Sequence, residues 1–306
     1  MAMTVGARTR PRTRARRRRG QGYAYLFILP YVLLLLLFGV GPAVYGTVIS
    51  FFDTTQDVWG VNGLANYATV LQDFRLGPAV VNVLVFMLIW LPLLVGLVLL
   101  LSLLLHARMG RFASAMRLIY YLPGAVAGSA LVLIWIFMFD PPLSPFGPLL
   151  NLLGFHSQDD ALNPTMFPGV FAVMALATGI GGWVVIVYGA LTNIPHEVLE
   201  AATIDGCNAP QMALRIKLPL VAKYVVFMLI LSFAGGIQLF VEPTILASAL
   251  TSGTVGTTWS VNQLAYVYAF TDGNFGKSAA VSVGLLLVAL AGALLVIFKT
   301  DFYRID

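Results

Sequence analysis

The sequence has little charge. Only 10% of its 306 residues are Asp, Glu, Lys or Arg, whereas soluble domains carry about 25%. Hydrophobic residues make up 59% of the chain, and the mean hydropathy is +0.88. This composition excludes an ordinary soluble domain and predicts a protein that crosses a membrane several times.

Residues that usually carry chemistry are also scarce. Cys207 is the single cysteine, which excludes an internal disulfide. The three histidines, His106, His156 and His196, have no partner at metal-ligand spacing. No nucleophile and base, and no pair of carboxylates, converge in the sequence. We therefore expect no metal and no catalytic residue, which argues against an intramembrane enzyme.

One short stretch has the appearance of a nucleotide site. Gly276-Lys277-Ser278 matches the end of a phosphate-binding loop. The full motif also needs glycine at position 271, which is Thr271 here. We therefore expect this chain to bind no nucleotide and no other cofactor.

The hydrophobic residues are gathered in long runs. A helix needs about 20 apolar residues to span a bilayer, and six segments are long enough. The sequence thus predicts an all-α polytopic fold with six transmembrane helices, near residues 25–50, 80–105, 115–139, 167–191, 220–246 and 279–299.

Residues 1–20 contain eight arginines. Such a run suits either nucleic acid or a cytoplasmic tail that sets membrane orientation. A long apolar helix follows at once and exceeds the apolar core of a signal peptide. The interpretation is a basic cytoplasmic tail at 1–20, a transmembrane domain at 21–306 and no nucleic-acid partner.

The basic residues fix the orientation of the six spans. With the N-terminus inside, 16 of the 18 Lys and Arg residues lie on the cytoplasmic side, and only Arg75 and Lys277 lie outside. Basic loops stay on the cytoplasmic side of a membrane. Both termini are therefore expected in the cytoplasm of a cell whose plasma membrane holds the chain.

The loop at 192–219 is polar, although it lies between two apolar segments. Asn193 is expected to cap a short helix that has Pro195 in its first turn. Gly206 is expected to end that helix in the left-handed conformation. Asn208 then begins a second short helix. The loop is predicted to face the cytoplasm.

The spacing in this loop resembles that of a known family. It contains Glu200-Ala201-Ala202, then Gly206 after three residues, then Ile216-Lys217-Leu218-Pro219 after nine more. This pattern is similar to the "EAA" loop of type I ABC importer permeases, and Ile194-Pro195 before it resembles the sugar-importing branch. Cys207 stands where that branch usually has alanine. The resemblance implies that a cytoplasmic ATPase is coupled through Glu200, Ala201, Ala202, Asp205, Gly206, Ile216 and Pro219.

Two outer segments carry the same resemblance. Gly63-Leu64-Ala65-Asn66-Tyr67 and Asn274-Phe275-Gly276 are both similar to stretches of sugar permeases. The resemblance implies four kinds of partner: a second permease subunit, ABC ATPase subunits that bind ATP and Mg²⁺, an extracytoplasmic solute-binding protein and the lipid membrane. It also implies transport by alternating access, without bond chemistry.

Polar side chains in the apolar segments suggest a path for the solute. Glu242 is costly within a membrane unless it faces a cavity or a partner. Gln238 lies four residues earlier and is expected on the same helix face. Asn82 and Trp183 are further candidates, with packing as the alternative. For Glu242 the alternative is the outer interface or a contact with the partner permease.

The identity of the solute stays open at this point. The loop patterns favour a carbohydrate, and the alternatives are glycerol phosphate, an amino acid or a metal. In a different class, an ion-coupled secondary transporter would use buried charges, for which Glu242 alone is thin support, and no inverted repeat is seen.

Overall fold

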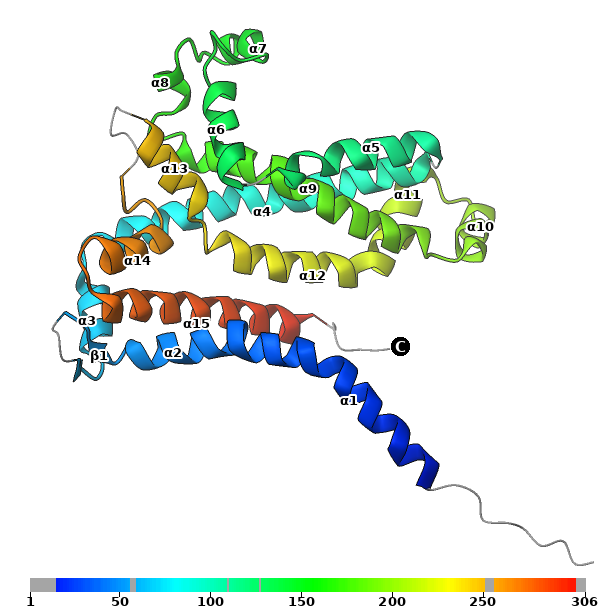
Figure 1. Cartoon of the computed structure of the whole chain (residues 1–306). Helices are drawn as coiled ribbons and strands as arrows, with labels where there is room; N and C mark the ends of the chain where they lie inside the picture. The colour runs from blue at the N-terminus through cyan, green and yellow to red at the C-terminus, as the bar shows by residue number, and fades with distance from the viewer. Residues whose placement is uncertain (1–14, 56–58, 109, 127, 251–255, 301–306) are drawn as a thin grey trace, which may run out of the picture. The chain divides into compact units, whose positions relative to one another are not determined.

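The structure is a computed structural model that describes residues 15–55, 59–108, 110–126, 128–250 and 256–300. It is built almost entirely of helices (Figure 1). The chain divides into two compact units, residues 1–48 and 49–306. Most of the predicted basic tail, residues 1–14, lies outside the described residues.

The first unit is a helical segment. Helix α1 (Ala15–Leu35) passes into a π-helical turn, η1 (Leu36–Val40), and then into α2 (Gly41–Ile49), which ends at the start of the second unit. The wider turn lies directly before Pro42, whose ring would clash with the carbonyl group four residues earlier in a regular α-helix. Residues Tyr25–Ile49 are long and apolar enough to span a membrane, as predicted.

The core of the second unit forms where α4 (Leu76–Ala107) packs along α9 (Phe167–Thr192). Both helices are apolar on all sides, which is typical of helices in a membrane. Helices α5 (Arg111–Tyr121) and α12 (Leu218–Gly236) complete the bundle around them. The largest fully buried side chains of α4 and α9 are Phe86, Leu94, Phe167, Phe171 and Met174.

The predicted third span, residues 115–139, is not one helix. It is divided into α5, a 3₁₀ turn η2 (Pro123–Ala125) and α6 (Gly128–Met138). Pro123 removes a backbone donor, and the turn that follows packs tightly on α9. A Cβ atom at Gly124 would lie 2.5 Å from the Thr178 carbonyl oxygen, and one at Gly181 would lie 2.1 Å from that of Tyr120. The glycines therefore permit backbone contact at the break.

The count of six spans is not confirmed. Among the described residues, five segments are long and apolar enough to cross a membrane: Tyr25–Ile49, Leu76–Ala107, Phe167–Thr192, Ala209–Ala249 and Phe275–Lys299. The fourth of these is also interrupted, because α12 ends at Gly236 and α13 begins at Val241. Hydrophobicity alone hides both interruptions.

Two polar ends flank the bundle of the second unit, at opposite ends in Figure 1. The α10 end comprises α10 (His196–Ile204), α11 (Ala209–Gln211) and the π-helical turn η3 (Met212–Lys217). The α14 end comprises β1 (Phe52–Asp53), β2 (Gly60–Val61), α3 (Ala65–Gln72), α14 (Val261–Phe270) and the start of α15 (Phe275–Lys299). Two short helices, α7 (Gly147–Leu152) and α8 (Gln158–Ala161), follow α6.

The α14 end is joined by buried hydrogen bonds. Asn66 is 1% exposed and donates to the carbonyl oxygens of Ser50 (2.9 Å) and Phe52 (2.8 Å). The Gly276 amide donates to Thr54 Oγ1 at 2.9 Å, and a Cβ atom at Gly276 would lie 2.3 Å from the Phe52 oxygen. The two outer sequence patterns therefore meet at one junction.

Helix α14 lies in the segment that connects α13 (Val241–Ala249) to α15. Ser260 caps it in a capping box with Gln263. Four of its residues at helical spacing, Val261, Leu264, Ala265 and Tyr268, are all buried.

Candidate functional site: the polar loop at the α10 end

The loop between α9 and α12 has strong local signals for its shape. Gly206 ends α10 with φ of 84°, a conformation that a side chain disfavours. Asn208 then caps α11: its side chain accepts from the Gln211 amide at 3.0 Å, and Gln211 Oε1 accepts from the Asn208 amide at 3.0 Å. The predicted stop at Gly206 and restart at Asn208 are both confirmed.

The prediction for the start of this loop is wrong. Asn193 is the C-terminal cap of α9, and Pro195 occupies the N-cap position of α10 without a side-chain hydrogen bond. Helix α9 runs on through Thr192, so Asn193 is used to end that helix before the next one begins.

Most residues of helix α10 have exposed side chains. Glu200 is exposed, Ile204 is 86% exposed and Ala202 is buried at 6%. The side chains of Leu199, Glu200, Thr203 and Ile204 border an open hollow on this surface. A small buried residue therefore seats the helix, while a carboxylate and an apolar side chain remain available for a partner.

One polar contact joins the α10 end to α4. Lys217, the last residue of η3, places its Nζ 3.0 Å from Nδ1 of His106. An ammonium group only donates, so His106 is the acceptor and its proton is on Nε2. His106 is 6% exposed and lies in the last turn of α4. Since α10 packs on η3, the Lys217–His106 contact connects this loop to α4.

Aromatic contacts surround this pair. The His106 ring meets the Tyr188 ring edge-on at 6.3 Å, and the guanidinium of Arg117 lies 4.2 Å from the centre of the Tyr188 ring. A cation over an aromatic face is attracted by the ring quadrupole. The ends of α4, α5 and α9 are thus joined beside η3.

The α14 end holds a charged cluster instead. Arg75 binds Asp73 through Nη2 at 2.8 Å and through Nε at 3.0 Å, and Tyr268 donates its hydroxyl proton to the same carboxylate. Arg75 and Tyr268 hold the pKa of Asp73 well below its usual range, and burial together with Asp73 raises the pKa of Tyr268 to about 12. The cluster ties the corner between α3 and α4 to α14.

The predicted solute-path residues lie at the break after α12. Gln238 is outside any helix, and its Nε2 donates to the Ala234 carbonyl oxygen at 3.1 Å. Glu242 is in the first turn of α13. The expectation that both share one helix face is wrong, because the helix is interrupted between them. The Gln238 carbonyl oxygen accepts a hydrogen bond from the Asn262 side chain of α14 at 3.1 Å. This carbonyl group in the non-helical segment therefore has a partner on α14.

The two further candidates, Asn82 and Trp183, both contact other parts of the chain. Asn82 Nδ2 donates to the Trp259 carbonyl oxygen at 3.1 Å and so fixes the segment before α14. The Trp183 ring meets the Phe227 ring edge-on at 6.1 Å.

Two buried polar atoms lie between α4 and α12. Trp90 Nε1 and Ser232 Oγ have no hydrogen-bond partner within the described part of the chain. Gly236 lies one turn beyond Ser232, and a Cβ atom there would lie 2.8 Å from the Trp90 ring. Buried polar atoms without partners are uncommon in folded proteins. Sequence reasoning missed both atoms because the packing of α4 against α12 joins residues that are far apart in the sequence.

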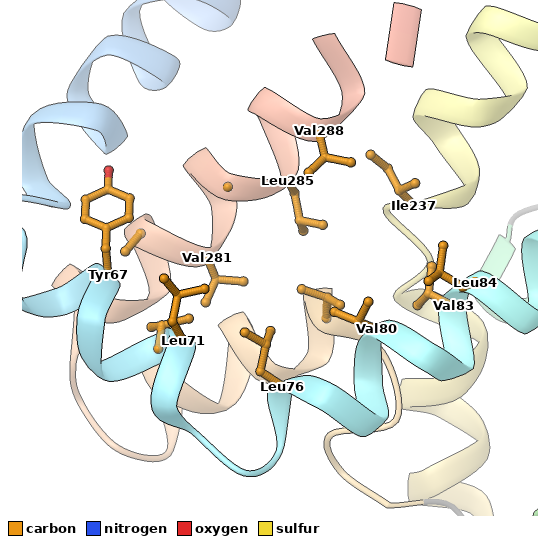
Figure 2. Close-up of a pocket in the computed structure, with 14 residues that line it drawn as sticks. Tyr67, Leu71, Leu76, Val80, Val83, Leu84, Ile237, Val281, Leu285 and Val288 are labelled. Atoms are coloured by element: carbon orange, nitrogen blue, oxygen red, sulfur yellow. The ribbon is translucent and has the colours of Figure 1, made fainter. Parts of the chain in front are cut away.

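An apolar cavity lies among α3, the start of α4 and α15, and Figure 2 shows the side chains that line it. Its volume is about 310 Å³. Side chains such as Leu71, Leu76, Val80 and Leu285 line it, and the hydroxyl of Tyr67 meets Ser50 Oγ at 2.6 Å. Such a cavity offers few hydrogen-bond partners to a solute with many hydroxyl groups. It is therefore a poor site for such a solute.

A bundle of membrane-length helices with a polar loop exposed at one end is the architecture of a multi-pass membrane protein. The chain belongs to the family of inner membrane components of binding-protein-dependent transport systems, whose model matches residues 70–302. It is therefore an all-α, multi-pass membrane protein, and the resemblance of its loop to ABC importer permeases is confirmed.

Relatives extend over nearly the whole chain. The arabinooligosaccharides transport permease AraP of Halalkalibacterium halodurans is 25% identical over 90% of this chain and 86% of its own length. The sn-glycerol-3-phosphate transport permease UgpA of Brucella suis is 29% identical over 86% and 89%. A crystal structure of a bacterial alginate ABC transporter has the same fold, with a TM-score of 0.76, 18% identity and coverage of 94% and 96%.

Proposed function

We propose that this chain is a permease subunit of an ATP-driven importer that moves a carbohydrate or carbohydrate-like solute into the cell. The observation that carries the proposal is the exposed α10 with Glu200-Ala201-Ala202, closed by Gly206 at positive φ. Named sugar permeases among the relatives support the solute class. The chain has no bond chemistry of its own in this proposal.

The mechanism is alternating access driven from the α10 end. Two ATPase subunits bind ATP and Mg²⁺ and close against α10, where Glu200, Ala201, Asp205 and Gly206 form the contact and the buried Ala202 seats the helix. Ile216 and Pro219 lie on either side of Lys217 and carry the motion into η3 and α12. The Lys217–His106 contact passes it to α4. A second permease subunit completes the path, and a solute-binding protein delivers the solute at the α14 end.

The proposed path lies along the break after α12. Gln238, Glu242 and Asn82 offer amide and carboxylate groups that can bind sugar hydroxyl groups. The orphaned Trp90 Nε1 and Ser232 Oγ supply further polar atoms between α4 and α12. Glu242→Gln and Gln238→Ala should each lower uptake or alter sugar preference while the ATPase still assembles. Parental uptake and preference in both variants would place the path elsewhere.

Glycerol phosphate is the second candidate, because permeases for it are among the relatives. A phosphate is usually bound by arginine or lysine. In the described part of the α14 end, Arg75 is paired with Asp73 and Lys277 lies 5.9 Å from the Tyr268 ring. The carboxylate of Glu242 would repel a phosphate, so the charges favour a neutral sugar.

The test is uptake into proteoliposomes that hold the whole transporter with its binding protein. ATP inside the vesicles should drive uptake of at least one labelled saccharide from a panel of pentose and hexose oligosaccharides. Uptake of sn-glycerol-3-phosphate alone would favour the second candidate. Uptake driven by a proton or sodium gradient without ATP would replace both with a secondary transporter.

Orientation is tested by cysteine labelling after Cys207→Ala. The proposal places α10 and both termini in the cytoplasm. Ser157→Cys should react with an impermeant reagent added outside intact cells, and Ser114→Cys should react only after lysis. Both serines are exposed in the structure. The reverse pattern would overturn the orientation and the ATPase assignment with it.

A further inference from the structure

A second cavity, of about 280 Å³, lies between α13 and α14. Its walls differ from the mainly aliphatic walls of the cavity in Figure 2, because several hydroxyl and amide side chains line it. Its size is close to the lower end of the range for small-molecule sites, about 300 Å³. The polar lining comprises Thr244, Ser248, Thr257, Gln263, Tyr266 and Thr271.

Two of these side chains have hydrogen-bonding groups without partners. Gln263 is 3% exposed, and its Oε1 accepts from the Ser260 amide at 3.1 Å. Its Nε2 donates to no other group in the described residues. The buried Oγ1 of Thr244 likewise has no partner there. A buried hydroxyl without a partner costs about 1–3 kcal/mol, and an amide Nε2 that bonds no other group is available to a ligand. Both groups therefore favour a ligand that brings its own oxygen atoms.

An aromatic surface adjoins the cavity. Tyr266 lines it and is 44% exposed, and its ring lies 4.8 Å from that of Phe270 and 5.5 Å from that of Phe240. Phe270 is itself 70% exposed. A sugar ring has hydroxyl groups on its rim and an apolar face of C–H groups. The hydroxyl groups of a sugar can bond Gln263 and Thr244, and its apolar face can stack on an aromatic ring.

We propose that the cavity between α13 and α14 is an entry subsite that holds one sugar unit of the solute before it reaches the path after α12. This inference rests on the proposed function. Asn262 links the two places, because it is on α14 and donates to the Gln238 carbonyl oxygen at the break. The subsite is at the end of the bundle opposite α10, where the binding protein releases its solute.

The first test is uptake kinetics in the whole transporter, with the saccharide that the parental chain takes up. Gln263→Glu keeps the oxygen that caps α14 and removes the free donor, and Thr244→Val removes the hydroxyl at equal size. Each should raise KM about fivefold to tenfold, the value of one hydrogen bond, and leave the maximal rate within about twofold. Thr69→Val is the matched control: its exposed hydroxyl bonds Ala65 in its own helix at 2.8 Å, and its KM should stay parental.

The second test is protection from labelling. In a Cys207→Ala chain, Ser248→Cys places a thiol at the cavity, and Ser282→Cys places one on the exposed part of α15. The transported saccharide should slow reaction of the first with a neutral maleimide and leave the second unchanged.

The outcomes separate this inference from the function itself. If no saccharide is taken up, both fall. If a saccharide is taken up, but Gln263→Glu and Thr244→Val behave as Thr69→Val does, the entry subsite is overturned and the function stands. In the labelling test, the sugar-free binding protein could protect Ser248→Cys while the saccharide has no effect. That result would show that the cavity contacts a protein, and it would overturn the subsite.

Discussion

The two polar ends of the second unit are built in opposite ways. At the α14 end, buried and part-buried hydrogen bonds join parts of the chain that are far apart in sequence, such as Gly276 with Thr54 and Asn82 with Trp259. At the α10 end, most hydrogen bonds stay within the loop, as between Asn208 and Gln211, and Lys217 reaches out to His106. We therefore call the α14 end the frame, because hydrogen bonds connect it to several distant segments. We call the α10 end the lever, because its side-chain contact with α4 is made by Lys217.

Helix α4 joins the two ends. It holds Asn82 near one end and His106 near the other, a separation of about 36 Å at 1.5 Å per residue. A displacement received at His106 can act against the frame at Asn82. The break after α12 begins at Gly236, which packs against Trp90 of α4, between Asn82 and His106 along that helix.

The largest effect is expected from Gly206→Val. The residue has φ of 84°, which a β-branched side chain cannot adopt without strain. The lever should lose its shape, and uptake should fall to background although the chain remains in the membrane. Uptake and co-purification of the ATPase measure this. Gly154→Val is the matched control, because Gly154 has φ of 90° and open space but lies beyond α7. Normal uptake by Gly206→Val would remove the coupling role.

A strong effect on stability is expected from Gly276→Ala in the frame. The new Cβ atom would lie 2.3 Å from the Phe52 carbonyl oxygen, so the junction must shift. We expect a loss of about 1–3 kcal/mol in the free energy of unfolding. Thermal unfolding in detergent measures it. Gly284→Ala on the same helix meets nothing within 4 Å and should be neutral or slightly stabilising. Equal melting temperatures for both variants would contradict the rigid frame.

A smaller effect, on coupling alone, is expected at the Lys217–His106 contact. Lys217→Met and His106→Leu should each lower the solute moved per ATP severalfold, while the ATPase still binds. Because the two residues share one contact, the double variant should be little worse than either single variant. Independent, additive losses would show that the contact does not carry the motion.

The smallest effect is expected from Tyr268→Phe, which removes one hydrogen bond to Asp73 and costs about 1 kcal/mol. The pKa of Asp73 is lowered, so its contribution to stability is present above the unfolded value of about 3.9. The pKa of Tyr268 is raised to about 12, so its contribution is present below the unfolded value of about 10. The deficit of the variant should thus be constant from pH 5 to pH 9. A deficit that changes across that range would contradict the cluster.

The difference between the α10 end and the α14 end also explains which features could be predicted from the sequence. The shape of the α10 end could be predicted because Gly206 and Asn208 act locally, through a turn and a cap. The prediction for the start of that loop was wrong, because Asn193 caps the end of α9 and not the beginning of α10. The α14 end was visible as two motifs, but nothing in the sequence said that Asn66 and Gly276 meet. The interruptions near Pro123 and Gln238 were missed because hydropathy averages over them, and packing against α9 and α14 decides them.

The central claim is that α10 is the lever on which the ATPase acts. The most direct measurement is site-specific photocrosslinking in the assembled transporter. A photoreactive residue in place of Ile204, which is 86% exposed on α10, should capture the ATPase in the presence of nucleotide. One in place of Leu152, which is 83% exposed on α7, should not. Capture of the ATPase at position 152 and not at position 204 would contradict the claim.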